Sequence, residues 1–197
     1  MMNKIDTCIE DRAVAFALGK HSGTPRKGTK IPYIVHPMEA AAIVAGITED
    51  QELIAAAVLH DTLEDTETGY EELVREFGER VAELVRAESE DKQAGRPADK
   101  TWKERKQETI DELAGEGYEA RLLALADKLS NIRAIQRDYE ELGDKLWQRF
   151  NQKCPREHAW YYGSLAKIFL SDDRLKETQA CREYADRVRA VFGQDAC

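Results

Sequence analysis

The chain has 197 residues and a formal net charge of −9, with 42% hydrophobic and 34% charged residues. A chain of this length can bury a hydrophobic core of its own, so we expect one compact domain over residues 1–197. The acidic balance, without any basic run, argues against nucleic acid as a partner, and the longest apolar stretch, residues 40–47, is too short to span a membrane.

Hydrophobic residues recur with helical periodicity along the whole chain, and no segment alternates as a half-buried strand does. Glycine and proline interrupt this pattern, for example at residues 95–97 and at Pro155. We therefore expect an all-α fold, a single helical bundle of about eight to ten helices without an internal repeat. The expected helices cover residues 11–18, 38–45, 52–60, 70–77, 79–87, 103–114, 118–137, 145–151, 157–170 and 174–191.

His36 lies just before the second expected helix, in the segment PYIVHP at residues 32–37. Proline is well tolerated in the first turn of a helix, so Pro37 indicates that a helix begins here. We expect His36 at the mouth of that helix, facing out of the preceding loop. In that position its imidazole is available as a ligand.

An adjacent His-Asp pair and two further carboxylates follow the third expected helix, as His60, Asp61, Glu64 and Asp65. On a helix these four side chains fall within an arc of about 140°. They come directly after the apolar run LIAAAVL at residues 53–59, where burying them without a partner would be costly. A divalent cation would supply that partner. The alternative is an acidic helix end exposed to water.

The helix expected over residues 118–137 carries a polar pair in apolar surroundings. Asp127 and Asn131 share one face at i, i+4 spacing. An aspartate in so apolar a helix should be paired or bound to a metal ion, the alternative being a cap or a salt bridge with a nearby arginine. The opposite face is an apolar stripe of Leu122, Leu125, Leu129 and Ile132.

These segments together supply two imidazoles and two carboxylates, from His36, His60, Asp61 and Asp127. Mixed nitrogen and oxygen ligands suit manganese, iron or zinc better than calcium, whose ligands are nearly all oxygen. Four protein ligands would leave one or two open positions on a six-coordinate ion, where water and a phosphoryl oxygen could bind.

The pattern resembles the HD-domain superfamily of metal-dependent phosphohydrolases, whose motif is H…HD…D. More closely, it resembles the alarmone hydrolase branch, which comprises the hydrolase domain of the RelA/SpoT homologues and the small alarmone hydrolases. The resemblance extends over residues 21–170. It rests on Arg26-Lys27 before PYIVHP at residues 32–37, on HDTLEDT at residues 60–66 and on LADKLSNIR at residues 125–133.

This resemblance implies an HD-domain helical bundle that holds a Mn²⁺ ion. It also assigns roles to residues of this chain. The implied metal ligands are His36, His60, Asp61 and Asp127. Glu64 and Asp65 would assist the attacking water, and the nucleotide would lie near Arg26, Lys27 and Asn131. His21 resembles a histidine that precedes the Arg-Lys loop in the family, and we expect it to make a structural hydrogen bond.

The implied reaction is the hydrolysis of the 3′-pyrophosphate of (p)ppGpp to GDP or GTP plus pyrophosphate, without a covalent intermediate. A chain of net charge −9 must bind this polyanion through local positive potential, from the metal and from Arg26, Lys27, Lys128 and Arg133. The metal would lower the pKa of a bound water, and Glu64 or Asp65 would position or deprotonate it.

Two alternatives remain open at this point. One is an HD phosphohydrolase that acts on another nucleotide, such as a mononucleotide, a dNTP or the 2′-phosphate of NADPH. The other is a non-catalytic nucleotide-binding module, against which the complete ligand set and both catalytic carboxylates argue. Metal-dependent turnover distinguishes this module from both enzymes.

Three further features carry weaker predictions. Residues 88–106 are dense in charge and predict a loop leading into a helix, whose Lys103, Arg105 and Lys106 are candidate substrate contacts or an ordinary solvated face. We expect residues 160–162, WYY, to pack in the core rather than to stack on a base. We expect His158 on a surface helix, with no chemical role.

The cysteines indicate the compartment. Cys8, Cys154, Cys181 and Cys197 are widely spaced and include no CxxC pair, so we expect free thiols rather than a zinc-thiolate site or a disulfide framework. The first six residues contain no apolar signal-peptide core. Both observations favour a reducing cytoplasm as the location, with a small-molecule nucleotide as the binding partner.

Overall fold

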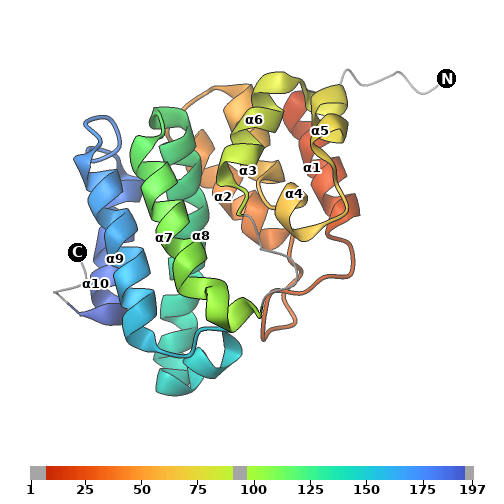
Figure 1. Ribbon diagram of the computed structural model, residues 1–197. Coiled ribbons are helices and arrows are strands. Elements are labelled where there is room, and N and C mark those ends of the chain that lie inside the picture. Colours follow the sequence, from red (N-terminus) through yellow and green to blue (C-terminus); the bar gives the residue numbers. More distant parts are fainter. Residues whose placement is uncertain (1–7, 91–96, 194–197) are drawn as a thin grey trace. The chain divides into compact units, whose positions relative to one another are not determined.

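The computed structural model describes residues 8–90 and 97–193. Their regular secondary structure is helical apart from one isolated β-bridge between Pro25 and Pro32, so the all-α prediction is confirmed (Figure 1). No helix in this part of the chain has both the length and the apolar character needed to cross a membrane. The helices are α1 (Ile9–Lys20), α2 (Val35–Ala45), α3 (Gln51–Leu59), α4 (Thr62–Asp65), α5 (Tyr70–Phe77), α6 (Glu79–Glu88), α7 (Ala98–Gly115), α8 (Tyr118–Leu142), the 3-10 helix η1 (Gly143–Arg149), α9 (Pro155–Ser171) and α10 (Gln179–Phe192).

The chain divides into two compact units, Met1–Ser89 and Glu90–Cys197. In the first unit α3 is the central helix, in contact with α1, α2 and α6. Its apolar run is buried at Leu53 and from Ala55 to Leu59. The small alanine side chains allow the neighbouring helices to pack closely against it. This buried helix ends directly at His60, so the first unit carries the His-Asp pair on its most buried element.

The start of α3 is held by a polar cluster. The Asp50 carboxylate caps the helix by accepting hydrogen bonds from the backbone N–H groups of Glu52 and Leu53, at 3.1 and 3.2 Å. Arg80 on α6 donates to the same carboxylate, and its Nη1 lies 2.7 Å from Glu52 Oε2. The hydrogen bond from Arg80 lowers the pKa of Asp50, against the opposing effect of partial burial. The cluster therefore ties α6 to the first turn of α3.

Replacing Arg80 by alanine should weaken this connection in a pH-dependent way. The folded state depresses the pKa of Asp50, so the stabilisation is present above its unfolded pKa of about 3.9 and is lost as the pH falls through the lower folded value. Because the pair is partly exposed, we expect Arg80→Ala to lower the free energy of unfolding by about 0.5–1 kcal/mol at neutral pH. The loss should shrink well below pH 4.

Urea unfolding at pH 7 and at pH 3 measures this difference. The matched control is Arg86→Ala, because Arg86 lies on the same helix and pairs with Glu83 on the surface. A loss of stability that is equal at the two pH values would contradict the prediction and would assign the role of Arg80 to the packing of its aliphatic stem.

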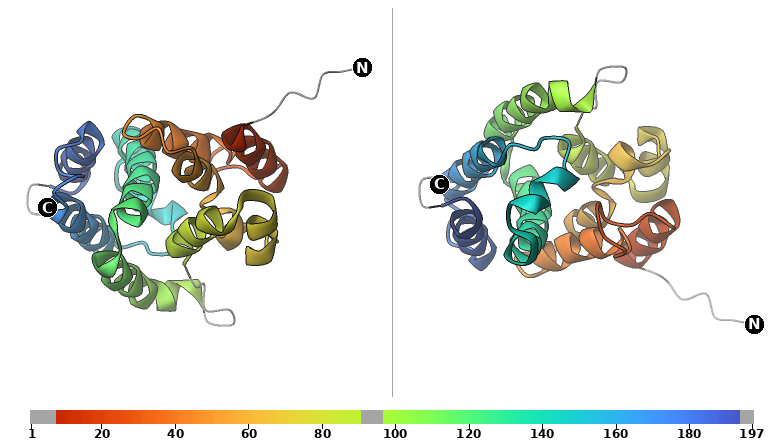
Figure 2. Two further views of the ribbon diagram at one scale, coloured as in Figure 1. Left: turned by 90° about the horizontal axis from the view of Figure 1, so that it is seen from above. Right: turned by 90° about the horizontal axis from the view of Figure 1, so that it is seen from below.

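In the second unit α8 contacts η1, α9 and α10, and α7 packs against α9 (Figure 2). The 25-residue helix α8 is buried along its length from Leu122 to Ile135, with the predicted leucine stripe fully inside. Tyr161 and Tyr162 of α9 are also buried, which confirms the predicted core packing for these two residues, whereas Trp160 is half-buried. This unit therefore builds its core around the helix that carries Asp127.

The ends of several helices, including the start of α7 and the end of α8, differ from the predicted ones, and the differences at α2 and α10 have local reasons. Helix α2 begins at Val35, so His36 lies inside the first turn and is buried, rather than at the mouth of a loop. Helix α10 begins at Gln179, later than predicted. The Asp172 carboxylate accepts the backbone N–H of Arg174 at 3.0 Å and holds a turn where the sequence pattern indicated helix.

Two predictions for the second unit are wrong. Residues 143–149 form a 3-10 helix rather than the predicted α-helix, because Gly143 at φ 55° ends α8. His158 is buried at 4% exposure and does not lie on the surface. Its ring stacks on Trp147 with the centroids 5.0 Å apart, and its Nε2 bonds to the carbonyl of Gln152 at 2.8 Å.

Candidate metal centre

Three predicted ligands converge in the first unit. His36 lies in the first turn of α2, and His60 directly follows α3; both are almost fully buried. Asp61 Oδ2 lies 3.0 Å from His60 Nε2 and 3.5 Å from His36 Nε2. Two imidazole nitrogens and one carboxylate oxygen therefore surround a single small volume, although the two helices come from different parts of the sequence.

The tautomer of His60 follows from a backbone contact. Its Nδ1 lies 2.8 Å from the carbonyl oxygen of Ala57, which can only accept, so Nδ1 carries a proton and donates it. In a neutral ring, Nε2 then presents its lone pair to Asp61 Oδ2 at 3.0 Å. Two electron-rich atoms at this distance repel each other unless a proton or a cation lies between them. The geometry therefore requires a proton or a metal cation between these two atoms.

The donor set fits a divalent transition metal. With metal–ligand bonds of about 2.1 Å, two neighbouring ligands of an octahedral ion lie about 3 Å apart. The distances of 3.0 and 3.5 Å from Asp61 Oδ2 to the two imidazoles lie close to this value. Neutral imidazole and carboxylate ligands suit manganese, iron or zinc. The hydrogen bond from His60 to Ala57 is the kind of outer contact that orients a metal-ligating histidine.

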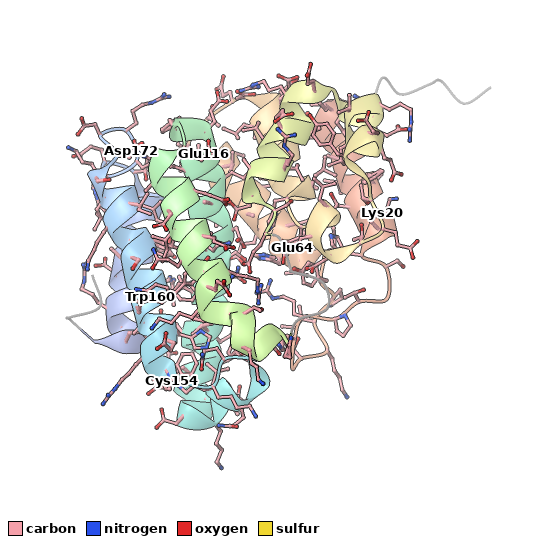
Figure 3. The ribbon with its side chains drawn as sticks, in the orientation of Figure 1. Lys20, Glu64, Glu116, Cys154, Trp160 and Asp172 are labelled. Atoms are coloured by element: carbon pink, nitrogen blue, oxygen red, sulfur yellow. The ribbon has the colours of Figure 1, made fainter. Side chains whose placement is uncertain are left out.

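The His-Asp segment is bent rather than a single helix. Helix α3 ends at Leu59, and Thr62 begins the short helix α4, which carries Glu64 and Asp65. The Thr62 hydroxyl donates to the Leu59 carbonyl at 2.6 Å and stabilises the bend. Glu64 is half-buried and lies on α4, where Figure 3 labels it. The four polar side chains therefore do not share one helix: His60 and Asp61 follow the end of α3, and Glu64 and Asp65 lie on α4.

Tyr33 joins Asp65, one of the two predicted catalytic carboxylates, to the predicted ligand Asp61. Its hydroxyl lies 2.7 Å from Asp61 Oδ2 and 3.0 Å from Asp65 Oδ2. The sequence analysis included Tyr33 in the PYIVHP segment but gave it no role. Its position could have indicated a role at the site, because Tyr33 lies three residues before His36 in the same segment.

His21 supports Tyr33 by ring packing, not by the predicted hydrogen bond. The two ring centroids are 4.8 Å apart. The Nε2 atom of His21 is buried and has no hydrogen-bond partner among residues 8–90 and 97–193. Burial is the largest influence on this ring and lowers the pKa of His21, so the imidazole is neutral near pH 7.

The Arg-Lys segment forms a tight hairpin-like loop. The backbone N–H of Arg26 donates to the carbonyl of Ile31 at 2.8 Å, and that of Tyr33 donates to Thr24 at 2.8 Å. Gly28 at φ 73° makes the reversal possible. Arg26 is half-buried, while Lys27 is exposed at the tip. Because the loop ends at Tyr33, it connects the two predicted substrate-binding cations to a residue of the site.

In the second unit Asp127 is buried at 4% exposure on α8. It pairs with the Lys128 ammonium group, and its Oδ1 accepts a hydrogen bond from Asn131 Nδ2 at 2.6 Å. This bond confirms that Asp127 and Asn131 share a helix face. The expectation of a partner for this carboxylate is met by the lysine and the amide, rather than by a nearby arginine.

Several other cations named in the sequence analysis pair with acids of the second unit. Arg133 makes a two-pronged contact with Glu183, with both N–O distances at 2.7 Å, which lowers the pKa of Glu183. Lys103 pairs with Glu157. Arg105 and Lys106 on α7 both pair with Glu90. Residues 91–96 of the predicted loop lie outside the described residues.

The family model of the HD domain matches residues 13–155 of this chain. The chain belongs to the HD domain family. The match begins in the first unit and ends in the second, so the HD domain includes residues of both units. Family membership implies a divalent metal ion, and the contacts of His36, His60 and Asp61 agree with one.

Several curated relatives of this HD domain carry the enzyme name guanosine-3′,5′-bis(diphosphate) 3′-pyrophosphohydrolase, and others, from Brucella, are named GTP pyrophosphokinase rsh. The Aquifex aeolicus protein is 39% identical over 135 residues, covering 68% of this chain and 19% of the relative, so the chain spans about a fifth of that protein. The Danio rerio protein, MESH1, is 37% identical over 139 residues, covering 69% of this chain and 74% of the relative. Human MESH1 is 39% identical over 129 residues, covering 64% and 68% respectively.

Two solved structures have a fold similar to that of this chain. The Listeria monocytogenes EGD-e protein lmo0812 superposes with a TM-score of 0.71 at 28% identity, covering 83% of this chain and 97% of that one. A metazoan orthologue of SpoT that hydrolyses ppGpp superposes with a TM-score of 0.70 at 26% identity, covering 93% and 94%. The HD-type helical fold predicted from the motifs is therefore confirmed.

Proposed function

We propose that this chain is a manganese-dependent 3′-pyrophosphohydrolase of (p)ppGpp-type alarmones, which releases pyrophosphate and leaves GDP or GTP. The observation that carries the proposal is the convergence of His36, His60 and Asp61 beside Asp65, in an HD domain several of whose relatives bear this enzyme name. The ligand set supports metal chemistry, and the relatives support the substrate class. Residues 1–197 would act as one catalytic domain.

The proposed metal ligands are His36, His60, Asp61 and Asp127. The contacts within the first unit support the first three. Asp127 is proposed as the fourth because it is a buried carboxylate in the position of the last aspartate of the H…HD…D motif. Mn²⁺ is the proposed ion, in agreement with two neutral imidazoles and two carboxylates as donors.

A bound metal ion would lower the pKa of a coordinated water and polarise an oxygen on the phosphorus that the water attacks. Glu64 and Asp65 are the proposed groups that orient this water and take its proton. Both lie on α4, within one turn of Asp61, and Asp65 is linked to Asp61 through Tyr33. Water would attack the phosphorus bonded to the ribose 3′-oxygen, and the bond between them would break without a covalent enzyme intermediate. Pyrophosphate would leave, and the 3′-oxygen would take up a proton to give the 3′-hydroxyl of GDP or GTP.

The proposed substrate contacts are Arg26, Lys27, Lys128 and Asn131. A tetra-anionic or more highly charged nucleotide needs local positive potential, because the chain as a whole has a net charge of −9. Arg26 and Lys27 project from a loop whose conformation is set by backbone hydrogen bonds. Lys128 and Asn131 lie on α8 and contact Asp127 directly, so they would bring donors close to the proposed fourth ligand.

The proposed compartment is the cytoplasm, where such nucleotides occur as small-molecule substrates. The cysteine pattern supports a reducing environment, since Cys8, Cys154 and Cys181 are free thiols. Cys197 lies outside the described residues.

A product assay on purified protein with Mn²⁺ tests the proposed substrate. We expect ppGpp and pppGpp to yield pyrophosphate, ppApp to reveal how strictly guanine is required, and NADPH and a dNTP to remain intact. Asp61→Ala serves as the blank, because it removes the carboxylate that contacts both histidines. Orthophosphate from NADPH, or cleavage of the dNTP in preference to ppGpp, would contradict the proposal and indicate another HD phosphohydrolase.

Metal removal should lower both activity and stability. A ligand that binds only the folded protein stabilises it by about 2.7 kcal/mol at one hundred times its Kd, which corresponds to a rise of roughly 5–10 °C in Tm for a chain of this size. We therefore expect dialysis against EDTA to abolish turnover and lower Tm, and Mn²⁺ to restore both. Differential scanning calorimetry with Mn²⁺, Zn²⁺ and Ca²⁺ checks this, and a Tm that is unchanged by every divalent ion would contradict the metal site.

A further inference from the structure

The hydroxyl of Tyr33 stands between two carboxylates. It lies 2.7 Å from Oδ2 of Asp61 and 3.0 Å from Oδ2 of Asp65. The same Asp61 oxygen faces His60 and His36. One phenol group therefore touches both the carboxylate that contacts the two histidines and a carboxylate proposed to handle the attacking water.

The two carboxylates differ greatly in how firmly they are held. Asp61 is largely buried, with 15% of its side chain exposed, whereas Asp65 is exposed at the end of the four-residue helix α4. Two anionic groups that share a neighbour repel each other, and an exposed side chain is free to change rotamer. The Tyr33 hydroxyl proton, shared between the two carboxylates, offsets this repulsion.

Tyr33 itself is held on several sides. Its ring packs on His21 at a centroid distance of 4.8 Å and meets the edge of His36 at 5.9 Å. Its backbone N–H donates to Thr24 at 2.8 Å, so the hairpin-like loop fixes its main chain. Tyrosine has few rotatable bonds, and a ring packed in this way can hold its hydroxyl in one place.

We infer that Tyr33 is a positioning residue, whose hydroxyl clamps Asp65 beside Asp61 and so sets the distance between the metal and the group that handles the attacking water. The inference rests on the proposed function for the role of Asp65. Tyr33 acts through Asp65 and is not itself a catalytic residue. Loss of the outer partner of a metal site typically costs about 10–100-fold in metal affinity or activity.

Tyr33→Phe tests the inference, because it removes only the hydroxyl. At saturating Mn²⁺ we expect kcat to fall by about 10–100-fold while KM changes by less than about 3-fold. The Mn²⁺ Kd, measured by electron paramagnetic resonance of the free ion, should rise by less than about 10-fold, because all of the proposed ligands remain. A kcat within 2-fold of the parent protein would overturn the inference, as would a kcat that recovers fully once Mn²⁺ saturates.

A double-mutant cycle shows whether Tyr33 acts through Asp65. In the Asp65→Ala background the further change Tyr33→Phe should lower kcat by less than about 2-fold, because the carboxylate that Tyr33 would hold is already absent. An undiminished loss of kcat in that background would overturn the inference. The matched control is Tyr70→Phe, because Tyr70 also donates to a carboxylate of the same unit, Glu83, away from Asp61. It should leave kcat unchanged.

Thermal unfolding of the metal-free proteins gives a readout that does not depend on turnover. The Tm losses caused by Tyr33→Phe and Asp65→Ala should not add, whereas those caused by Tyr70→Phe and Asp65→Ala should. Additive losses for the first pair would overturn the clamp. If the parent protein proved inactive on ppGpp, the proposed function would fail, but this cycle and the Mn²⁺ Kd would still decide whether Tyr33 holds Asp65.

Discussion

His60→Ala is expected to abolish both metal binding and hydrolysis, with kcat/KM falling by about 10³-fold or more, equivalent to about 4 kcal/mol of transition-state stabilisation. His60 is buried, its Nδ1 donates to Ala57, and its Nε2 faces Asp61 at 3.0 Å. Alanine removes the imidazole nitrogen and leaves an anionic oxygen beside a cavity. His36 and Asp61 alone would bind a divalent ion weakly.

Metal analysis after gel filtration measures the first effect, and the ppGpp assay measures the second. A general loss of folding would mimic both, so the control must match the burial of His60. His158→Ala provides this control, because His158 is another buried histidine that bonds to a backbone carbonyl, in the second unit. It should lower Tm while leaving the metal content intact. If His60→Ala retained a full equivalent of metal, His60 would not be a ligand.

Asp127→Ala extends the same measurement to the proposed fourth ligand. We expect this variant to lose metal and activity together, because the carboxylate is buried and ionic in character, with Lys128 and Asn131 as neighbours. A normal metal content with normal activity would remove Asp127 from the site.

Glu64→Gln is expected to keep the metal ion and lose turnover. Glutamine preserves the shape of the side chain but cannot accept the proton of the attacking water, so kcat should fall by about 10²–10⁴-fold, the usual contribution of general acid–base catalysis. Glu64 lies on α4 beyond Asp61 and is half-buried. The charge is removed without opening a cavity in the core.

Steady-state kinetics together with manganese titration separates the two effects. Glu71→Gln is the matched control, because it makes the same substitution at an exposed position on the neighbouring helix α5. It should change neither kcat nor metal content. Loss of metal from Glu64→Gln would instead make Glu64 a ligand, and an unchanged kcat would leave Asp65 as the proposed base. Asp65→Asn, measured in parallel, ranks the two carboxylates.

The helices whose ends are marked by local chemistry were predictable from the sequence. Residues 70–77 form α5 over the predicted range, because Gly69 and Gly78 flank an amphipathic segment on both sides. The start of α10 was not predictable in the same way. Residues 174–178 continue the helical pattern, but the Asp172 carboxylate accepts hydrogen bonds from the backbone N–H groups of Arg174 and Leu175 and holds a turn there. Hydrophobic periodicity does not predict such a side-chain hydrogen bond.

The burial of single residues also depended on tertiary packing. His158 was predicted on a surface helix, yet it is enclosed by the rings of Trp147, Trp102 and Phe150. Trp102 lies on α7 and Trp147 on η1, while Phe150 directly follows η1. No local pattern in α9 indicates that the face bearing His158 meets an aromatic cluster, because that cluster exists only after α7 and η1 have packed against it.

The sequence by itself determined the all-α fold class and, through the resemblance to the H…HD…D motif, the residues proposed as metal ligands and the apolar helices that carry them. These follow from periodicity, from the cost of burying unpaired polar groups and from ligand chemistry, all of which are local properties. Only the tertiary structure decided that Asp61 faces two histidines at 3.0 and 3.5 Å and that Tyr33 bridges Asp61 and Asp65. The physical reason is that the loop ending at Tyr33 and helix α2 pack against the end of α3, although these segments are almost thirty residues apart in the sequence. The spacing of side chains along one segment cannot predict which distant segment packs against it.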